Sequence, residues 1–423
     1  MLAPLLTDMA LVFCLLVLLC VLNVIRVEGV AMNRTLPPVL YFPGYGASQL
    51  FAQVDDAKYI PSACANVSIP IGTAFLVEDN TKCGMTLLTS LFDPQTALFT
   101  SPEGIRIFTG QVGDFTTISS NNYDFVKILE SWGYVVGVNL FGVPYDYRLM
   151  SDASLTANGF ISSVTNLIEH VVKLNQGRKV VVIGHSNGGP TMYTYLTSTS
   201  VRQTWKDTHI QAMVGLSGNY LGQMNCISTF LYNPEALRQD MAGSWEANYG
   251  SITWGGYEPA LVYTIVTTYS HTPQEKNYTA SVADLADLFT SVNRQDWVQR
   301  LYGVYGMLPV NPRTRNNNRN MMDRSAHPRV NVHCLYGMDL PTVYQYVYGQ
   351  GAHTNSFEKV GVMGGDGDQD IVDNTFCATW ATDVRGQGFV TEAVGFSNVT
   401  HMDMYCNDQV MQKVYSILDS YRS

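Results

Sequence analysis

The stretch Gly184-His185-Ser186-Asn187-Gly188 constrains this chain more than any other feature of its sequence. It follows the β-branched run Val180-Val181-Val182-Ile183, which is typical of a strand buried on both faces of a parallel sheet. Residues 190–196 after it are compatible with a helix, because proline is tolerated in a first helical turn. A G-x-S-x-G motif between a strand and a helix is typical of a nucleophile elbow, a strained turn that exposes a serine hydroxyl. The sequence therefore predicts Ser186 as a nucleophile.

Two further side chains with the right chemistry follow the serine in the right order. A serine hydroxyl needs an imidazole to take its proton and a carboxylate to orient that imidazole. In the α/β-hydrolase fold the acid comes next along the chain and the histidine last. The acidic stretch 365–370 offers Asp366 and Asp368, and His401 follows a predicted core strand at 388–394. We therefore expect an ordered serine, aspartate and histidine triad.

Strand and helix patterns alternate along most of the chain. The predicted strands cover residues 38–42, 135–140, 180–183, 212–216 and 330–336. An amphipathic pattern predicts a helix over 154–175, and another helix is expected at the C-terminus. Such alternation predicts an α/β protein with a mostly parallel sheet, here of the α/β-hydrolase fold.

Two long stretches interrupt this pattern. The strand pattern disappears from residue 222 to about 328, which predicts a cap inserted at about 223–328 of a hydrolase domain spanning 36–423. A second irregular block, at about 50–107, contains short apolar pieces around Ile69, Ile71, Phe75 and Leu76. These pieces fit either a membrane-facing segment or ordinary core.

Composition limits the possible partners. The chain has 423 residues, a formal charge of −10, 46% hydrophobic residues and 14% charged residues. A negative charge of this size argues against nucleic-acid binding and against simple electrostatic attachment to anionic membranes.

The N-terminal residues 1–31 read as a targeting segment. Residues 10–25 are nearly all apolar, and Gly29-Val30-Ala31 suits signal cleavage. The alternative is an uncleaved membrane anchor. Both place the remaining chain in a lumen or outside the cell.

Six cysteines remain after this segment: Cys64, Cys83, Cys226, Cys334, Cys377 and Cys406. They lack the close C-x-x-C spacing of a zinc site, so we predict disulfides and no metal, with fifteen pairings open. Asn-x-Ser/Thr sequons at Asn33, Asn66, Asn277 and Asn398 predict a glycoprotein, although a glycan on Asn398 would crowd His401.

Several stretches together resemble the lecithin:cholesterol acyltransferase family, nearest its lysosomal phospholipase A2 branch. They run in family order from about residue 36 to the C-terminus: Pro38-Val39-Leu40-Tyr41-Phe42-Pro43-Gly44, Val143-Pro144-Tyr145-Asp146-Tyr147-Arg148, residues 184–188, Trp205-Lys206-Asp207, Cys334-Leu335-Tyr336-Gly337, Gly365-Asp366-Gly367-Asp368, Cys377 with Trp380, and His401.

The resemblance implies Ser186 as nucleophile, Asp368 as acid and His401 as base, with Asp366 as the alternative acid. It implies that the backbone N–H groups of Tyr45 and Asn187 form the oxyanion hole. It also implies the disulfides Cys64–Cys83 and Cys334–Cys377, the first closing a membrane-facing loop.

The resemblance further implies a phospholipase A and O-acyltransferase without metal or organic cofactor. Its partners would be a phospholipid membrane or lipoprotein surface and a lipid alcohol acceptor. The chain departs from the family where Asn187 replaces a Met or Leu and where residues 216–222 replace a Gly-Ala-Pro-Trp-Gly-Gly stretch. A general lipase or esterase, or a non-catalytic lipid-binding relative, are the alternatives.

Overall fold

The computed structural model describes residues 36–55, 70–71, 87, 91–93, 98–119, 122–149, 152–220, 265–269, 274–278, 326–348 and 359–422. The targeting segment, Cys64, Cys83, Cys226 and most of the predicted cap lie outside these ranges. Among the helices described, none is long and apolar enough to cross a membrane.

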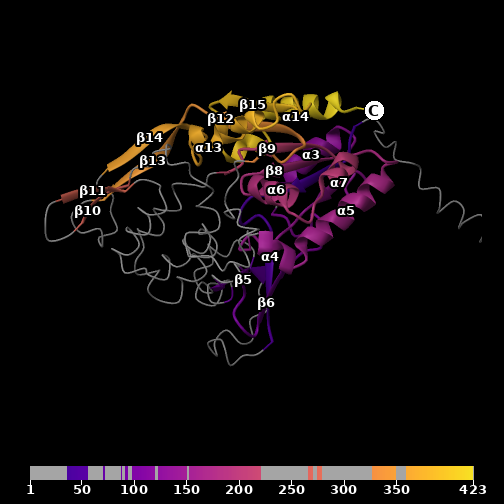
Figure 1. Ribbon diagram of the computed structural model, residues 1–423, viewed down its shortest axis with the longest axis horizontal. Helices are drawn as coiled ribbons and strands as arrows, with labels where there is room; N and C mark the ends of the chain where they lie inside the picture. The colour runs from indigo at the N-terminus through magenta and orange to yellow at the C-terminus, as the bar shows by residue number, and fades with distance from the viewer. Residues whose placement is uncertain are drawn as a thin grey trace, which may run out of the picture.

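In the part of the chain that the structure describes, six strands form the central sheet, in the order β15-β12-β9-β8-β1-β7. Figure 1 labels β8, β9, β12 and β15 of this sheet. They are β1 Val39–Phe42, β7 Leu140–Gly142, β8 Val180–His185, β9 Ile210–Leu216, β12 Asn331–Met338 and β15 Thr391–Ser397. Every neighbouring pair is parallel. The predicted α/β-hydrolase fold with a mostly parallel sheet is confirmed.

The sheet order reverses beside β1. The chain first pairs β1 with β7 on one side and then places β8 on the other side of β1. From β8 it continues outward through β9 and β12 to β15. Open parallel sheets bind ligands at the carboxyl ends of the strands next to such a reversal. This position lies between the ends of β1 and β8.

Helices bury both faces of the sheet, which explains the unbroken apolar run of β8. On one face Val181 and Ile183 join a core with α3 (Tyr123–Ser131) and α14 (Asp408–Ser420). On the other face Val180 and Val182 pack with residues of α5 (Phe160–Leu174) and α6 (Gly188–Thr197). All residues of β8 are buried, as expected for a strand covered on both sides.

The predicted helix over 154–175 is two helices, α4 (Asp152–Ala157) and α5. Gly159 between them has a left-handed φ of 80°. The Asn158 side chain accepts a hydrogen bond from the Phe160 N–H at 3.0 Å and so stabilises the turn before the second helix. The helically spaced apolar residues begin only at Phe160, so the pattern supports α5 and not a continuous helix from residue 154. Helix α7 (Gln203–His209) precedes β9.

The predicted strand 135–140 begins later than expected, because β7 starts only at Leu140. The preceding residues form a turn in which Gly137 has a φ of 79°. The Asn139 side chain accepts a hydrogen bond from the Val135 N–H at 2.6 Å and stabilises this turn.

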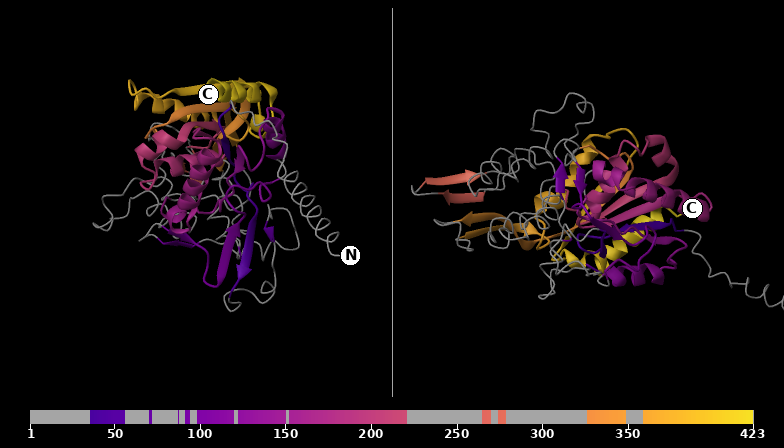
Figure 2. Two further views of the ribbon diagram at one scale, coloured as in Figure 1. Left: turned by 90° about the vertical axis from the view of Figure 1, so that its right-hand side faces the viewer. Right: turned by 90° about the horizontal axis from the view of Figure 1, so that it is seen from below.

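Four strands outside the central sheet project from the body of the molecule (Figures 1 and 2). They form a sheet in the order β11-β10-β13-β14, with bounds β10 Ile265–Tyr269, β11 Gln274–Tyr278, β13 Leu340–Tyr348 and β14 Lys359–Gly365. The sequence pattern did not reveal these strands: β13 and β14 lie between the predicted strand 330–336 and the acidic stretch, and β10 and β11 lie within the range predicted as a cap, 223–328. Pro341 in β13 and the glycines of β14 disguise these strands, since both residue types are unfavourable inside a strand.

The predicted irregular block at 50–107 contains small antiparallel sheets. One has the order β3-β2-β6, with β2 Leu50–Val54, β3 Pro70–Ile71 and β6 Ile105–Thr109. The other pairs β4 (Leu91–Asp93) with β5 (Leu98–Thr100).

The disulfide between Cys334 and Cys377 is present. It joins β12 to the 3₁₀ helix η5 (Phe376–Thr382), and both sulfurs belong to buried residues. Cys406 carries a free thiol, so the structure shows no third bridge at this residue. The pairing Cys64–Cys83 lies outside the described residues.

Loss of the Cys334–Cys377 bridge should destabilise the fold. The two cysteines are 43 residues apart, and a loop of this length corresponds to about 4 kcal/mol in the chain-entropy account of disulfides. We expect Cys334→Ser with Cys377→Ser to lower the free energy of unfolding in urea by about this amount. Cys406→Ser is the control and should leave it nearly unchanged. An unaltered unfolding midpoint in the double variant would contradict this.

Candidate active site

Ser186 lies in a sharp turn between β8 and α6. Its φ is 52°, in the left-handed region that a serine rarely adopts. A Cβ on Gly184 would lie 2.6 Å from the carbonyl oxygen of Gly188. A Cβ on Gly188 would lie 2.1 Å from the carbonyl oxygen of Phe42, at the end of β1. The turn therefore accepts only glycine at these two positions, which is the geometry of a nucleophile elbow.

The strained turn is held by hydrogen bonds on both sides. The Ser186 N–H donates to the Leu216 carbonyl at the end of β9, at 3.0 Å, and the Gly189 N–H donates to the Ser186 carbonyl at 2.9 Å. Ser186 itself is 7% exposed. The serine is thus fixed at the carboxyl ends of the central strands.

His401 follows β15, on the loop where the sequence predicted it. Its Nδ1 lies 2.9 Å from Oδ2 of Asp366, and its backbone N–H donates to the Asp366 carbonyl at 2.9 Å. Both side chains are buried. Because Nδ1 is engaged by the carboxylate, Nε2 is the imidazole nitrogen left to exchange a proton with a serine.

Asp366, and not Asp368, is the carboxylate at His401. The Oδ1 atom of Asp366 accepts hydrogen bonds from the backbone N–H groups of Asp368 at 3.0 Å and of Gln369 at 2.7 Å. Asp368 thus contributes its amide to the turn, while its side chain is exposed. The choice of Asp368 as the acid is therefore corrected in favour of the alternative, Asp366. Since β14 ends at Gly365, Asp366 is the first residue to leave the strand, and the turn that follows carries Asp368 away.

The electrostatics of this pair suit an imidazole that accepts a proton. Burial lowers the pKa of His401, whereas the charge and hydrogen bond of Asp366 raise it, and the charge of Asp368 adds to this. The upward contributions outweigh burial, so the pKa of His401 is raised. Burial raises the pKa of Asp366, but His401 and the backbone amides lower it by more. Asp366 therefore stays ionised and stabilises a protonated His401.

Ser217 and His185 contact the pair formed by Asp366 and His401. The Ser217 side chain hydrogen-bonds Asp366 and helps to lower its pKa. The Nε2 atom of His185 lies 2.9 Å from the His401 carbonyl oxygen, and the two rings are 4.9 Å apart. Burial and the charge of His401 lower the pKa of His185 to about 3, so His185 is neutral and donates this bond. The sequence did not predict these contacts of Ser217 and His185, because a serine after a strand or a histidine before the nucleophile carries no specific signal.

The loop after β1 lies against the serine. A Cβ on Gly44 would lie 3.1 Å from the Ser186 Cβ and 3.3 Å from the His185 Nδ1. Tyr45 directly follows Gly44, and Asn187 directly follows Ser186. That the backbone N–H groups of Tyr45 and Asn187 form the oxyanion hole stays a prediction.

Metal ligands are not gathered at this site. Among the residues that the structure describes, no group of three or more His, Cys, Asp or Glu side chains is arranged to hold a metal ion. The chemical capacity on view is that of a serine, an imidazole and a carboxylate.

Comparisons with known proteins agree with the resemblance found in the sequence. Residues 73–236 match the model of the lecithin:cholesterol acyltransferase family. The lysosomal phospholipase A and acyltransferase of Homo sapiens is 23% identical over 412 residues, covering 90% of each chain. The lecithin-cholesterol acyltransferase-like 1 protein of Arabidopsis thaliana is 25% identical, covering 80% of this chain and 81% of its own.

A third relative is the phosphatidylcholine-sterol acyltransferase of Gallus gallus, 22% identical and covering 89% of each chain. Among solved structures, the Bacillus licheniformis lipase BlEst2 covers 92% of this chain and 94% of its own, with a TM-score of 0.33 and 9% identity.

The exchange of roles between the two aspartates is testable. Asp366→Asn should lower the hydrolysis rate by roughly ten-thousandfold, because an amide favours the wrong imidazole tautomer. Activity requires neutral His401 and so falls as pH drops through its raised pKa. Without the Asp366 charge that pKa falls, so the midpoint of the residual activity moves to lower pH.

Asp368→Asn is the matched control, two residues away. It should keep most of the activity and move the same midpoint down only slightly, since its charge is a lesser cause of the raised pKa of His401. A pH–rate series on both variants checks this. Asp368→Asn as the more damaging change would contradict the assignment.

Proposed function

We propose that this relative of the lecithin:cholesterol acyltransferase family is a serine-dependent O-acyltransferase with phospholipase A activity. It takes an acyl chain from a glycerophospholipid and passes it to a lipid alcohol or to water. The observation that carries the proposal is the contact of His401 with Asp366 in the fold that also holds Ser186 in a nucleophile elbow. The full-length relatives named as phospholipase A and acyltransferase support the substrate class.

The first half of the reaction transfers the acyl chain to the enzyme. Ser186 Oγ attacks the ester carbonyl while His401 Nε2 takes the hydroxyl proton, and the backbone N–H groups of Tyr45 and Asn187 stabilise the oxyanion. Each such donor contributes roughly 3 kcal/mol to the transition state. The intermediate collapses, His401 returns the proton to the leaving oxygen, and a lysophospholipid departs.

The second half releases the acyl chain. His401 takes a proton from water or from a lipid alcohol, whose oxygen attacks the acyl-enzyme carbonyl. Collapse of this second intermediate returns the proton to Ser186 and releases a fatty acid or a new ester. Asp366, ionised and bonded to Nδ1, stabilises the imidazolium in both halves.

Product analysis separates this function from its alternatives. Vesicles of a phospholipid with a labelled acyl chain should yield labelled fatty acid, and added long-chain alcohol should divert label into an ester. Ser186→Ala should abolish both products, because both pass through the same acyl-enzyme. A folded Ser186→Ala protein that keeps either activity would remove Ser186 from this role.

A general lipase or esterase would share the whole triad. It would hydrolyse triacylglycerol in preference to phospholipid vesicles in a parallel assay. A non-catalytic relative would form no product from either lipid.

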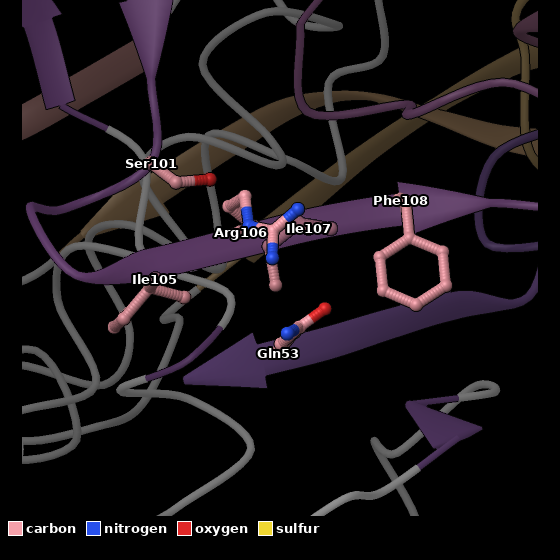
Figure 3. A pocket seen from close by; sticks show the side chains of 6 residues that line it. All are labelled: Gln53, Ser101, Ile105, Arg106, Ile107 and Phe108. Atoms are coloured by element: carbon pink, nitrogen blue, oxygen red, sulfur yellow. The ribbon is translucent and has the colours of Figure 1, made fainter. Parts of the chain in front are cut away.

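We further propose that the protein works at a phospholipid surface and that the β3-β2-β6 sheet contributes to the contact. Phe108 on β6 is 50% exposed, and its ring lies 5.5 Å from that of Phe51 on β2. An open pocket beside them is lined by Gln53, Ser101, Ile105, Arg106, Ile107 and Phe108 (Figure 3). None of these residues belongs to the triad, so this pocket is a surface feature separate from the chemistry.

Apolar insertion and charge attraction give different salt dependence. Attraction between surface charges is screened over about 8 Å at physiological ionic strength, whereas apolar insertion is not. With a net charge of −10, we expect binding to phosphatidylcholine vesicles to survive raised salt. Phe108→Ser should weaken binding several-fold in a flotation assay.

Leu174→Ser is the control, because Leu174 is 40% exposed at the end of α5 and outside this sheet. Binding that collapses with salt, or that responds equally to both substitutions, would contradict the proposed surface. Phe75 and Leu76, which the sequence offers either as membrane anchors or as ordinary core, lie outside the described residues.

The same proposal places the protein in a secretory or endolysosomal lumen, or outside the cell. Lysosomal relatives and the oxidised Cys334–Cys377 pair support it, since structural disulfides persist in oxidising compartments. Cleavage of residues 1–31 remains part of the proposal, and N-terminal sequencing of the mature protein tests it.

A further inference from the structure

A buried chain of hydrogen bonds connects the elbow to the loop after β1. The Asn187 side-chain amide donates to the Tyr145 hydroxyl at 3.3 Å. The Tyr145 hydroxyl in turn donates to the Pro43 carbonyl at 2.8 Å. Asn187 follows Ser186, and Pro43 precedes Gly44 and Tyr45. The chain therefore spans the two backbone segments from which the oxyanion donors are proposed to come.

We infer that Tyr145 is a positioning residue that sets the spacing of the two oxyanion donors, with the Asn187 side chain as its second anchor. The inference rests on the proposed function. It also gives a role to the polar side chain of Asn187, which directly follows Ser186.

Tyr145 is itself held firmly enough to act as a reference point. It is 1% exposed, and its ring packs edge-on against Phe160 of α5 with centroids 6.1 Å apart. Its backbone N–H donates to Oγ of Ser48 at 3.1 Å, so the residue contacts the loop after β1 at both ends. Burial raises the pKa of the Tyr145 hydroxyl, which stays protonated and able to donate at any working pH.

The three residues after Tyr145 also stabilise this segment. Arg148 and Asp146 form a buried ion pair, with Nη2 2.6 Å and Nε 2.8 Å from the carboxylate oxygens. The ring of Tyr147 lies 4.8 Å from that of Tyr45, in an edge-on contact. The ion pair thus stiffens the segment that follows Tyr145, and Tyr147 packs that segment against the loop that carries Tyr45.

Precise spacing matters because an oxyanion hole works only when both donors point at one oxygen. Donors must lie about 2.7–3.1 Å from the oxyanion, and losing one costs roughly 10²–10³ in rate. A displacement of about 1 Å costs on the order of 10²-fold. Removing the Tyr145 hydroxyl leaves both donors in place but frees the Pro43 loop to shift.

The rate of labelling by a fluorophosphonate tests the inference without any assumption about the lipid substrate. The probe needs an activated serine and an oxyanion hole. We expect Tyr145→Phe to lower the second-order labelling rate roughly 10- to 100-fold. The pH midpoint of labelling should not move, because His401 and Asp366 are unchanged. On phospholipid vesicles kcat should fall with little change in KM.

The matched control is Tyr134→Phe. The Tyr134 hydroxyl is buried and donates to the Pro37 carbonyl at 2.8 Å, at the opposite end of the same strand β1. Removing the Tyr134 hydroxyl deletes the same kind of hydrogen bond far from the serine, so the Tyr134→Phe variant should be labelled at the wild-type rate. Equal rates for Tyr145→Phe and wild type, or equal losses in both variants, would overturn the inference.

A second variant removes the first donor of this series of hydrogen bonds. Asn187→Leu keeps the size of the side chain but removes the donor to Tyr145, and it should slow labelling by a smaller factor. The double variant with Tyr145→Phe should be no slower than Tyr145→Phe alone, since both act through one chain. Multiplied losses, or a shifted pH midpoint, would contradict the shared role. Wild-type protein that labels but makes no product would instead count against the proposed function alone.

Discussion

The absence of side chains at Gly184 and Gly188 is the constraint on which the site depends. A Cβ on Gly188 would lie only 2.1 Å from the carbonyl oxygen of Phe42, so the elbow packs directly against the end of β1. In the same turn Ser186 lies against Gly44 and has a φ of 52°. A strained backbone of this kind persists only where its surroundings over-determine it. Here β8, β9 and the loop after β1 all bear on it.

The order of the parallel strands then determines which residues can join the serine. Since β8, β9, β12 and β15 lie side by side, their carboxyl ends meet at one edge of the sheet. Ser217 follows β9 and His401 follows β15, and both reach Asp366. The Cys334–Cys377 bridge fixes β12, the strand between them, to the segment that follows the acidic turn. With the hydrogen bond between His185 and the His401 carbonyl oxygen, residues more than two hundred positions apart in sequence form one buried network.

The sequence predicted what depends on local pattern. The elbow, the parallel sheet and the position of His401 follow from runs of apolar residues and from glycine spacing. Asp366 and Asp368 are not distinguished by pattern, because both stand in the same glycine-rich repeat. Only the end of β14 at Gly365, in a strand that glycines disguise, decides which carboxylate reaches His401. Contacts such as that of Asn187 with Tyr145 join distant segments, and no local signal announces them.

In the proposed mechanism Ser186, activated by His401 and Asp366, carries the acyl chain. Mass spectrometry of protein quenched in acid shortly after mixing with phospholipid vesicles tests this most directly. We predict an adduct with the mass of one fatty acid less one water on the peptide that contains Ser186, and its disappearance when long-chain alcohol is added in excess. Rapid product formation with the acyl group on another residue, or with no dependence on Ser186, would contradict the account.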